Sequence, residues 1–255
     1  MGTNNRRGKI LLYGIGINDV DAPTNWRENG KKVADPYYSM WQKIFERCYS
    51  PLYKKQFPTY IGVTVHSDWH RFSKFKEWVD NQPQKDWRDL YLDKDLRVKG
   101  NKVYGPDTCC FLTNQENNIF RLSGNQLGVA CYKRDHFRNS PWASISYIGY
   151  NKPKGINKHL GYCTTKEEAE VVAGRESIRR IMEIVNANPH EFIRRDMMRW
   201  VEEWKQELLL REERWSAIRV ELPLFEISND TPLKPTKTDC NPLFPTSPHL
   251  KHMGE

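Results

Sequence analysis

Three stretches decide how the second half of this chain folds: GNQLGVACYKRDHF (Gly124–Phe137), SPWASISYIGY (Ser140–Tyr150) and KHLGYCTTKEEAEVVA (Lys158–Ala173). Short runs rich in β-branched and aromatic residues predict three strands. Helical spacing of apolar residues begins after Thr165, where Thr-x-x-Glu168 forms a capping box. The order predicts a small antiparallel sheet followed by a helix.

The middle strand is expected to have two unlike faces, because alternate residues of a strand point to opposite sides of the sheet. The two sets are Trp142, Ser144 and Ser146 on one face and Ala143, Ile145 and Tyr147 on the other. We expect Ala143 and Ile145 to pack on the following helix. The face with hydroxyls and an aromatic ring, close to basic residues, is one that reads a DNA groove.

Four motifs in this segment are Gly128-Val129, Trp142-Ala143-x-Ile145, Leu160-Gly161 and Thr165-x-Glu167-Glu168-Ala169. In order and spacing they resemble the plant APETALA/ethylene-response-factor DNA-binding domain, whose outward strand residues contact bases and phosphates. With the neighbouring basic residues, the resemblance implies a double-stranded DNA surface made of Tyr132, Lys133, Arg134, Arg138, Trp142, Ser144, Ser146, Lys154, Lys158 and His159. Several strand arginines of the family are replaced here, so the base preference stays open.

The charge is concentrated on the same segment. The 255 residues carry a formal net charge of +8, which favours a polyanionic partner. Residues 124–162 hold six bases and one acid, a net of +5, whereas residues 175–219 hold ten bases and nine acids, a net of +1. We therefore expect the sheet segment, rather than the later helices, to meet the polyanion.

A second pattern runs through LDKD (Leu92–Asp95), GNKVYGPDTCCFLT (Gly100–Thr113) and NQENNIFR (Asn114–Arg121). It predicts a strand, a loop, a strand and a helix, with a carboxylate on the first strand and an amide on the helix. A one-metal nuclease needs hard oxygen ligands for a divalent ion beside the scissile phosphate, and a general base to activate water.

The motifs Tyr104-x-Pro106-Asp107-Thr108-Cys109 and Gln115-Glu116-Asn117-Asn118, with upstream aromatic runs, extend this pattern over residues 37–121. It resembles the HNH endonucleases of phages and mobile introns, in which the association with an APETALA-like domain is typical of homing-type enzymes. The resemblance implies that Asp93 and Asn118 hold Mg²⁺ or another divalent cation.

Two positions depart from the HNH pattern: Lys94 stands where the family has its general-base histidine, and Thr108 where it has its middle asparagine. Lysine, with an ordinary pKa of about 10.4, is a poor base near neutral pH but a good phosphate contact. We therefore expect Lys94 to contact phosphate. His66 and His70 are the candidate bases, and surface positions without a catalytic role are the alternative for both.

Targeting and metal signals are weak. No apolar run approaches the roughly 20 residues of a membrane-spanning helix, and the polar start Met1–Lys9 does not resemble a signal peptide. We expect no membrane partner and a cytoplasmic protein, in the host cytosol if it is phage-encoded. Cys48, His66 and Cys110 are candidate ligands of a structural zinc ion, but the sequence has no CxxC pair to support one.

The expected fold class is α+β, with a small ββα HNH-like core, a three-stranded antiparallel sheet plus helix, and a helical C-terminal extension. The aromatic spacing predicts helices over Tyr37–Tyr49 and Trp69–Trp78. The expected domains are an HNH-like module (1–122), an APETALA-like module (123–187), a helical extension (188–220) and a proline-rich tail (221–255). Residues 10–35 are expected to form a loop or short hairpin.

Three functions compete at this point. The leading one is sequence-preferring DNA binding with metal-dependent cleavage or nicking. The first alternative is a DNA-binding regulator or anti-host factor on a nuclease scaffold that has lost its base. The second is a protein-interaction factor that binds a partner through the C-terminal helices and tail.

Overall fold

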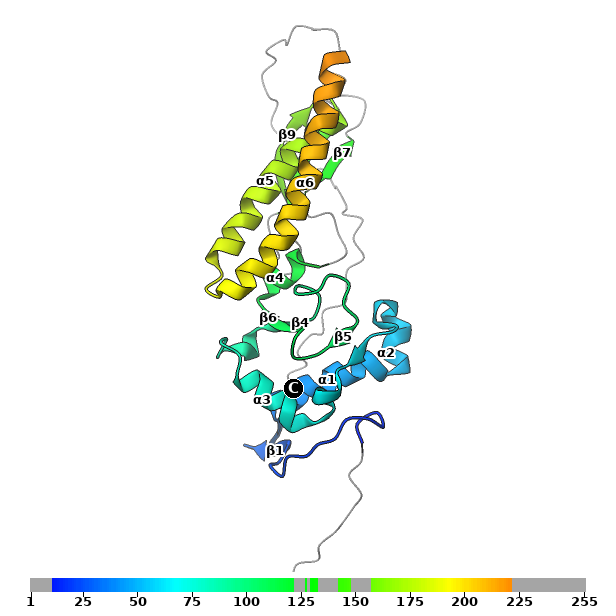
Figure 1. Ribbon diagram of the computed structural model, residues 1–255, viewed down its shortest axis with the longest axis vertical. Coiled ribbons are helices and arrows are strands. Elements are labelled where there is room, and N and C mark those ends of the chain that lie inside the picture. The colour runs from blue at the N-terminus through cyan, green and yellow to red at the C-terminus, as the bar shows by residue number, and fades with distance from the viewer. Residues whose placement is uncertain (1–10, 122–126, 128, 133–141, 148–156, 222–255) are drawn as a thin grey trace, which may run out of the picture. The chain divides into compact units, whose positions relative to one another are not determined.

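The computed structural model describes residues 11–121, 127, 129–132, 142–147 and 157–221. The chain divides into two compact units, one of Met1–Leu122 with Ile184–Trp200 and one of Ser123–Glu183 with Val201–Glu255. Helices and small two- or three-stranded sheets make up both units (Figure 1). The chain is thus mixed α/β with small sheets, as the sequence predicts.

The core of the first unit is built on α1 (Pro36–Tyr49), which begins at a strong cap. Asp35 Oδ1 accepts the backbone N–H of Tyr38 at 2.8 Å, and Pro36 occupies the first turn, where its missing donor costs nothing. The helix packs on α3 (Phe72–Asp80). Its buried face consists of Trp41, Ile44, Phe45 and Cys48.

The aromatic run Trp69–Trp78 is not one helix, so this part of the sequence interpretation is wrong. Ser67–His70 forms the 3₁₀ helix η2, Arg71 is extended with φ −97° and ψ 125°, and α3 begins only at Phe72. The spacing of three residues suited both a 3₁₀ and an α turn, and it did not reveal the break. Trp69 still packs on Phe75, with ring centroids 5.0 Å apart.

Two short sheets lie beside this aromatic core. β3 (Thr64–Val65) pairs in parallel with β5 (Val103–Tyr104), and β4 (Tyr91–Asp93) pairs antiparallel with β6 (Cys110–Leu112). Other short helices of this unit are α2 (Pro51–Gln56), η1 (Pro58–Tyr60) and η3 (Trp87–Asp89).

α4 (Asn114–Ile119) follows β6 directly and contacts both β4 and β6. A reciprocal capping box starts it: Thr113 Oγ1 accepts the Glu116 N–H at 3.2 Å, and Glu116 Oε2 accepts the Thr113 N–H at 2.8 Å. Buried Glu116 also accepts a 2.6 Å hydrogen bond from Asn188 Nδ2. The predicted strand, loop, strand and helix are therefore present in this order.

The second unit contains a three-stranded antiparallel sheet in the order β7 (Val129–Tyr132), β8 (Trp142–Tyr147), β9 (Asn157–Cys163). The β8–β9 register shifts between Ser144 and Ile145, because Ser144 pairs with Gly161 and Ile145 with His159. α5 (Lys166–Ala187) follows β9, and its beginning carries the expected cap: Thr165 Oγ1 accepts the Glu168 N–H at 3.1 Å.

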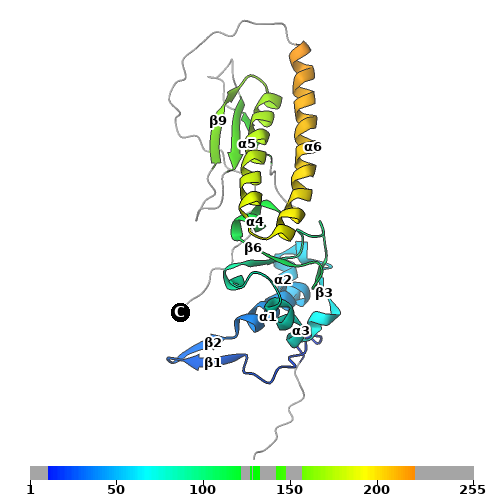
Figure 2. The ribbon, with the colours of Figure 1, turned by 60° about the vertical axis from the view of Figure 1, so that its left-hand side comes forward.

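α6 (Glu191–Glu221) begins in the first unit, and from Val201 onward it lies alongside α5 within the second unit (Figures 1 and 2). Gly174 is the point of close approach, since a Cβ there would lie 2.6 Å from Leu208 Cδ1. Arg175 Nε and Glu212 Oε1 add an ion pair at 2.8 Å between the two helices. Among the described residues, no helix is long and apolar enough to cross a bilayer.

The first unit also carries a two-stranded ribbon before α1. β1 (Asn25–Glu28) pairs antiparallel with β2 (Lys31–Ala34), and Asn29-Gly30 forms the turn between them. The expected loop or short hairpin is therefore a hairpin. In Figure 2 it extends away from α1 and α3.

Two buried tryptophans of the first unit give a matched test of its core. Trp41 Nε1 donates to the Trp69 carbonyl at 2.7 Å, whereas Trp69 Nε1 is buried without a hydrogen-bond partner. Both side chains are at most 1% exposed. Trp41→Phe leaves the Trp69 carbonyl unpaired, but Trp69→Phe removes a donor that is already unpaired.

We therefore expect Trp41→Phe to lower the free energy of unfolding by about 2 kcal/mol more than Trp69→Phe. Urea denaturation of the two variants measures the difference directly, since each loses the same atoms. Equal losses would contradict the assigned hydrogen bond.

Candidate functional site

The site predicted for a metal begins at Asp93, the last residue of β4. Asp93 Oδ1 accepts two backbone N–H groups, from Asp95 at 2.9 Å and from Leu96 at 2.7 Å. This arrangement turns the chain immediately after the strand. Burial, with the nearby charge of Asp95 adding to it, raises the pKa of Asp93 from 3.8 to about 6.

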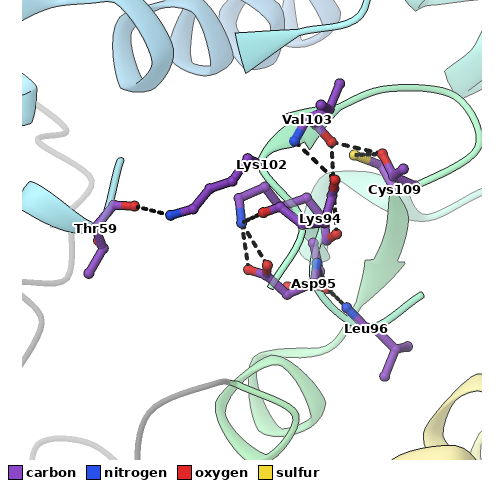
Figure 3. A network of polar contacts seen from close by, with 10 residues as sticks. Thr59, Lys94, Asp95, Leu96, Lys102, Val103 and Cys109 are labelled. Atoms are coloured by element: carbon purple, nitrogen blue, oxygen red, sulfur yellow. Dashed lines mark hydrogen bonds and ion pairs between the residues drawn. The ribbon is translucent and has the colours of Figure 1, made fainter. Parts of the chain in front are cut away.

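Lys94 is buried and all three of its ammonium protons have partners inside the unit. Nζ donates to Asp95 Oδ1 at 2.7 Å, to Asp95 Oδ2 at 2.8 Å and to the Asn101 carbonyl at 2.8 Å. Figure 3 shows the side chain directed at Asp95, while Lys102 points away to the Thr59 carbonyl. In place of the predicted phosphate contact, Lys94 forms an internal ion pair that closes the loop after β4.

Asn101 completes this loop from the other side. Its Nδ2 donates to the carbonyls of Lys94 at 2.9 Å and Val103 at 2.6 Å, and its Oδ1 accepts the Val103 N–H at 3.0 Å. Thr108, at the middle position of the HNH pattern, donates its hydroxyl to the same Val103 carbonyl at 2.8 Å. The two departures from the pattern therefore belong to one hydrogen-bonded network within the core.

Asn118 lies on α4, which contacts the strand that carries Asp93. Asn118 Nδ2 donates to the Asn114 carbonyl at 2.8 Å and to Asn114 Oδ1. Its amide is thus oriented along its own helix. In the part of the chain that the structure describes, no group of three or more His, Cys, Asp or Glu side chains is placed to hold a metal ion.

The two candidate zinc thiols are buried and reduced. Burial raises the pKa of Cys48 to about 12 and that of Cys110 well above its usual value. Both thiols are therefore protonated at neutral pH in this arrangement, and binding of zinc would have to release their protons.

The candidate base His66 lies next to Gly105, in the loop between β5 and β6. A Cβ on Gly105 would be 2.9 Å from His66 Cβ, so glycine allows this close approach. The imidazole is 44% exposed, and its Nδ1 accepts the Asp68 N–H at 3.3 Å. A neutral imidazole with this acceptor carries its proton on Nε2.

His70, the other candidate base, has a packing role. Its Nε2 lies 3.1 Å from the Val65 carbonyl, which requires a proton on that nitrogen. Its ring packs edge-on against Phe45 at 6.2 Å. In both histidines Nε2 is therefore a donor, and the Nδ1 lone pair of His66 already accepts the Asp68 N–H.

On the sheet, the assignment of Ser144 to a DNA-facing surface is wrong. Ser144 is fully buried, and its Oγ donates to the Ala169 carbonyl of α5 at 2.8 Å. Because alternate residues share a face, half-buried Trp142 lies on this helix side as well. Ala143 and Ile145 are buried as expected, but on the opposite face of β8. The small serine fits beneath the helix, where its hydroxyl finds a carbonyl.

Among the sheet side chains whose exposure the structure describes, the exposed polar ones are on β9. His159 is exposed and its ring packs on Tyr162 with centroids 4.7 Å apart. Lys158 is 51% exposed and pairs with Glu176 of α5 at 3.1 Å. Hydrogen bonds from Arg179 and Lys158 lower the pKa of Glu176 to about 2, so this carboxylate is ionised at neutral pH.

Two further predicted DNA contacts, Tyr132 and Ser146, are placed by the pairing of their strands. Tyr132 pairs with Trp142, and Ser146 with Lys158, through their backbones. Four predicted contacts lie outside the described residues: Lys133, Arg134, Arg138 and Lys154.

Sequence reasoning missed three partners that define these sites, namely Asp95, Asn101 and Glu176. Asp95 adjoins Lys94, and this adjacency was a usable signal for an ion pair. Asn101 and Glu176 lie seven and eighteen residues from the lysines they serve. Sequence periodicity does not link two residues of a loop that are seven positions apart. It also does not link a strand residue to a helix residue eighteen positions away.

Comparison with protein families, curated proteins and solved structures finds no match to this chain. The functional interpretation therefore depends on the geometry of these side chains.

The raised pKa of Asp93 gives a pH-dependent prediction. A carboxyl group whose folded pKa is about 6 stabilises the fold below pH 3.8 and loses that contribution as the pH rises through 6. At pH 7 the ionised group costs up to about 3 kcal/mol. Asp93→Asn keeps the Oδ1 acceptor without the charge, so we expect it to be more stable than the wild type at pH 7 and equal at pH 4.

Denaturant unfolding at both pH values measures this effect. Asp95→Asn is the matched control, because it weakens the ion pair with Lys94 and should destabilise the protein at pH 7. A loss of stability in both variants at pH 7 would show that Asp93 is not a strained carboxylate.

Proposed function

We propose that this chain is a double-stranded DNA-binding protein in which the ββα core is a scaffold and not a hydrolytic centre. The observation that carries the proposal is the ion pair of Lys94 with Asp95, at the position that the HNH pattern reserves for the general base. An ammonium group whose three protons are engaged neither accepts a proton nor approaches a phosphate.

The DNA-binding part of the proposal is supported by charge and by the sheet. Residues 124–162 carry a net charge of +5 within the +8 of the chain. β9 exposes Lys158 on the side of the sheet that carries α5, where it pairs with Glu176, and exposes His159, whose ring packs on Tyr162, on the other side. Basic and aromatic groups of this kind contact phosphates and sugars, and antiparallel strands fit a DNA groove.

Metal-dependent nicking is the second candidate function. It is favoured by the strand, loop, strand and helix order, which puts Asp93 and Asn118 on contacting elements, and by the exposed imidazole of His66 beside the loop. In such a site Asp93 and Asn118 would supply oxygen ligands for Mg²⁺ or another divalent cation.

Supercoiled plasmid separates the two functions. Under the proposal, purified protein retards duplex DNA on a gel, and its affinity falls steeply as the salt concentration rises. It produces no nicked circles with Mg²⁺ or Mn²⁺. Nicks that disappear with Asp93→Ala, while DNA retardation persists, would establish the nuclease instead. Absence of any retardation at low salt would reject DNA binding and leave the protein-interaction alternative.

A second experiment tests the position of the DNA on the sheet. Glu176→Gln removes the negative charge that neutralises Lys158 and Arg179. We expect about threefold tighter DNA binding at low salt, with a steeper salt dependence. Glu183→Gln is the control, because it removes the same charge two helical turns further along α5, where Glu183 pairs with Arg179.

Gel-shift or fluorescence-anisotropy titrations at several salt concentrations measure both variants. An equal gain from the two substitutions would mean that net charge or the shared partner Arg179, and not Lys158, is responsible, and the assignment of DNA to β9 would then be wrong.

A further inference from the structure

The β1–β2 ribbon is the element of the first unit that is least explained by packing. Every residue of the two strands is exposed except half-buried Val33. Figure 2 shows the ribbon extending away from the helices of its unit. A two-stranded hairpin alone is only marginally stable in water, so the core of this unit gives no reason for its presence.

The turn fixes which side chains face each other. Asn29 and Gly30 both have positive φ, 50° and 77°, as a two-residue type I′ turn requires. The register follows from it: Asn25 pairs with Ala34, Trp26 with Val33, Arg27 with Lys32 and Glu28 with Lys31.

The two faces of the ribbon differ in their electrostatics. One face contains two favourable pairs, Trp26 with Val33 and Glu28 with Lys31. The other, which we call the basic face, consists of Asn25, Arg27, Lys32 and Ala34. The ribbon is thus amphipathic in charge, although neither face is buried.

On the basic face Arg27 stands directly opposite Lys32, and like charges in this position are destabilising. Among the described residues, no carboxylate forms an ion pair with either side chain. Arg27 makes one long contact, from Nη1 to the Gly30 carbonyl at 3.5 Å. An anion between the two cations would turn this repulsion into attraction.

We propose that the basic face of the β1–β2 ribbon inserts into the major groove of duplex DNA, as a contact separate from the sheet of the second unit. The inference rests on the proposed DNA-binding function. The major groove of B-form DNA, about 12 Å wide, admits a two-stranded ribbon, whereas that of A-form RNA is too narrow. Arg27 and Lys32 can bind phosphates or guanine edges, and Asn25 can bind adenine.

Neighbouring lysines on opposite faces provide a matched test. In the full-length chain, Lys32→Ala and Lys31→Ala each remove one exposed lysine from β2, but only Lys32 belongs to the basic face. With a mixed-sequence duplex at low salt, we expect Lys32→Ala to weaken binding about fivefold and to reduce the salt slope by about one. Arg27→Ala should behave in the same way, and Lys31→Ala should change affinity less than twofold.

The outcomes separate this inference from the function on which it rests. Wild-type binding with equal losses for Lys31→Ala and Lys32→Ala, or with no loss for either, overturns the ribbon contact and leaves DNA binding intact. Failure of the wild type to bind DNA rejects both. Tighter binding to an A-form RNA duplex, lost with Lys32→Ala, would overturn the choice of DNA. Thermal melting should change little in all three variants, because each substituted side chain is exposed and takes part in a single weak cross-strand pair.

Discussion

The first unit depends on hydrogen bonds that compensate the burial of one ammonium group, that of Lys94. Lys94 is only 9% exposed, and a buried lysine without compensation would destabilise the fold strongly or lose its proton. Bonds to both oxygens of Asp95 and to the Asn101 carbonyl satisfy it completely. The loop between β4 and β5 is therefore fixed by electrostatics, while the surrounding core is held by aromatic packing.

The same loop explains why the ββα order does not imply hydrolysis. A nuclease needs an unpaired base next to the metal ligands, in a site that water and phosphate can enter. Here the corresponding side chain points inward to Asp95, and Thr108 donates to a backbone carbonyl. The strand, loop, strand and helix order is held by the pairing of β4 with β6 and by the contacts of α4 with both, and none of these requires a catalytic side chain at the two positions.

Much of the secondary structure was predictable, because local signals determine it. Asp35 before Pro36, Thr113 with Glu116, and Thr165 with Glu168 each start a helix through their own side chains. The face of β8 was not predictable in the same way. Alternation gives two faces but does not say which one meets the helix, and serine is small enough to be buried when a carbonyl such as that of Ala169 accepts its proton.

The functional residues were harder to predict than the fold, because a sequence reports charges but not their pairing. Lys94 contributes to the net charge of +8, yet its ammonium group is neutralised by an ion pair with Asp95. Lys158 shares Glu176 with Arg179. Arg27 and Lys32 face each other across the ribbon, and no carboxylate of the described residues forms an ion pair with either of them. Counterion release depends on cations that are free to meet phosphate. Under the proposed function, the basic residues that can bind DNA are therefore determined by the internal ion pairs rather than by the number of lysines and arginines in a segment.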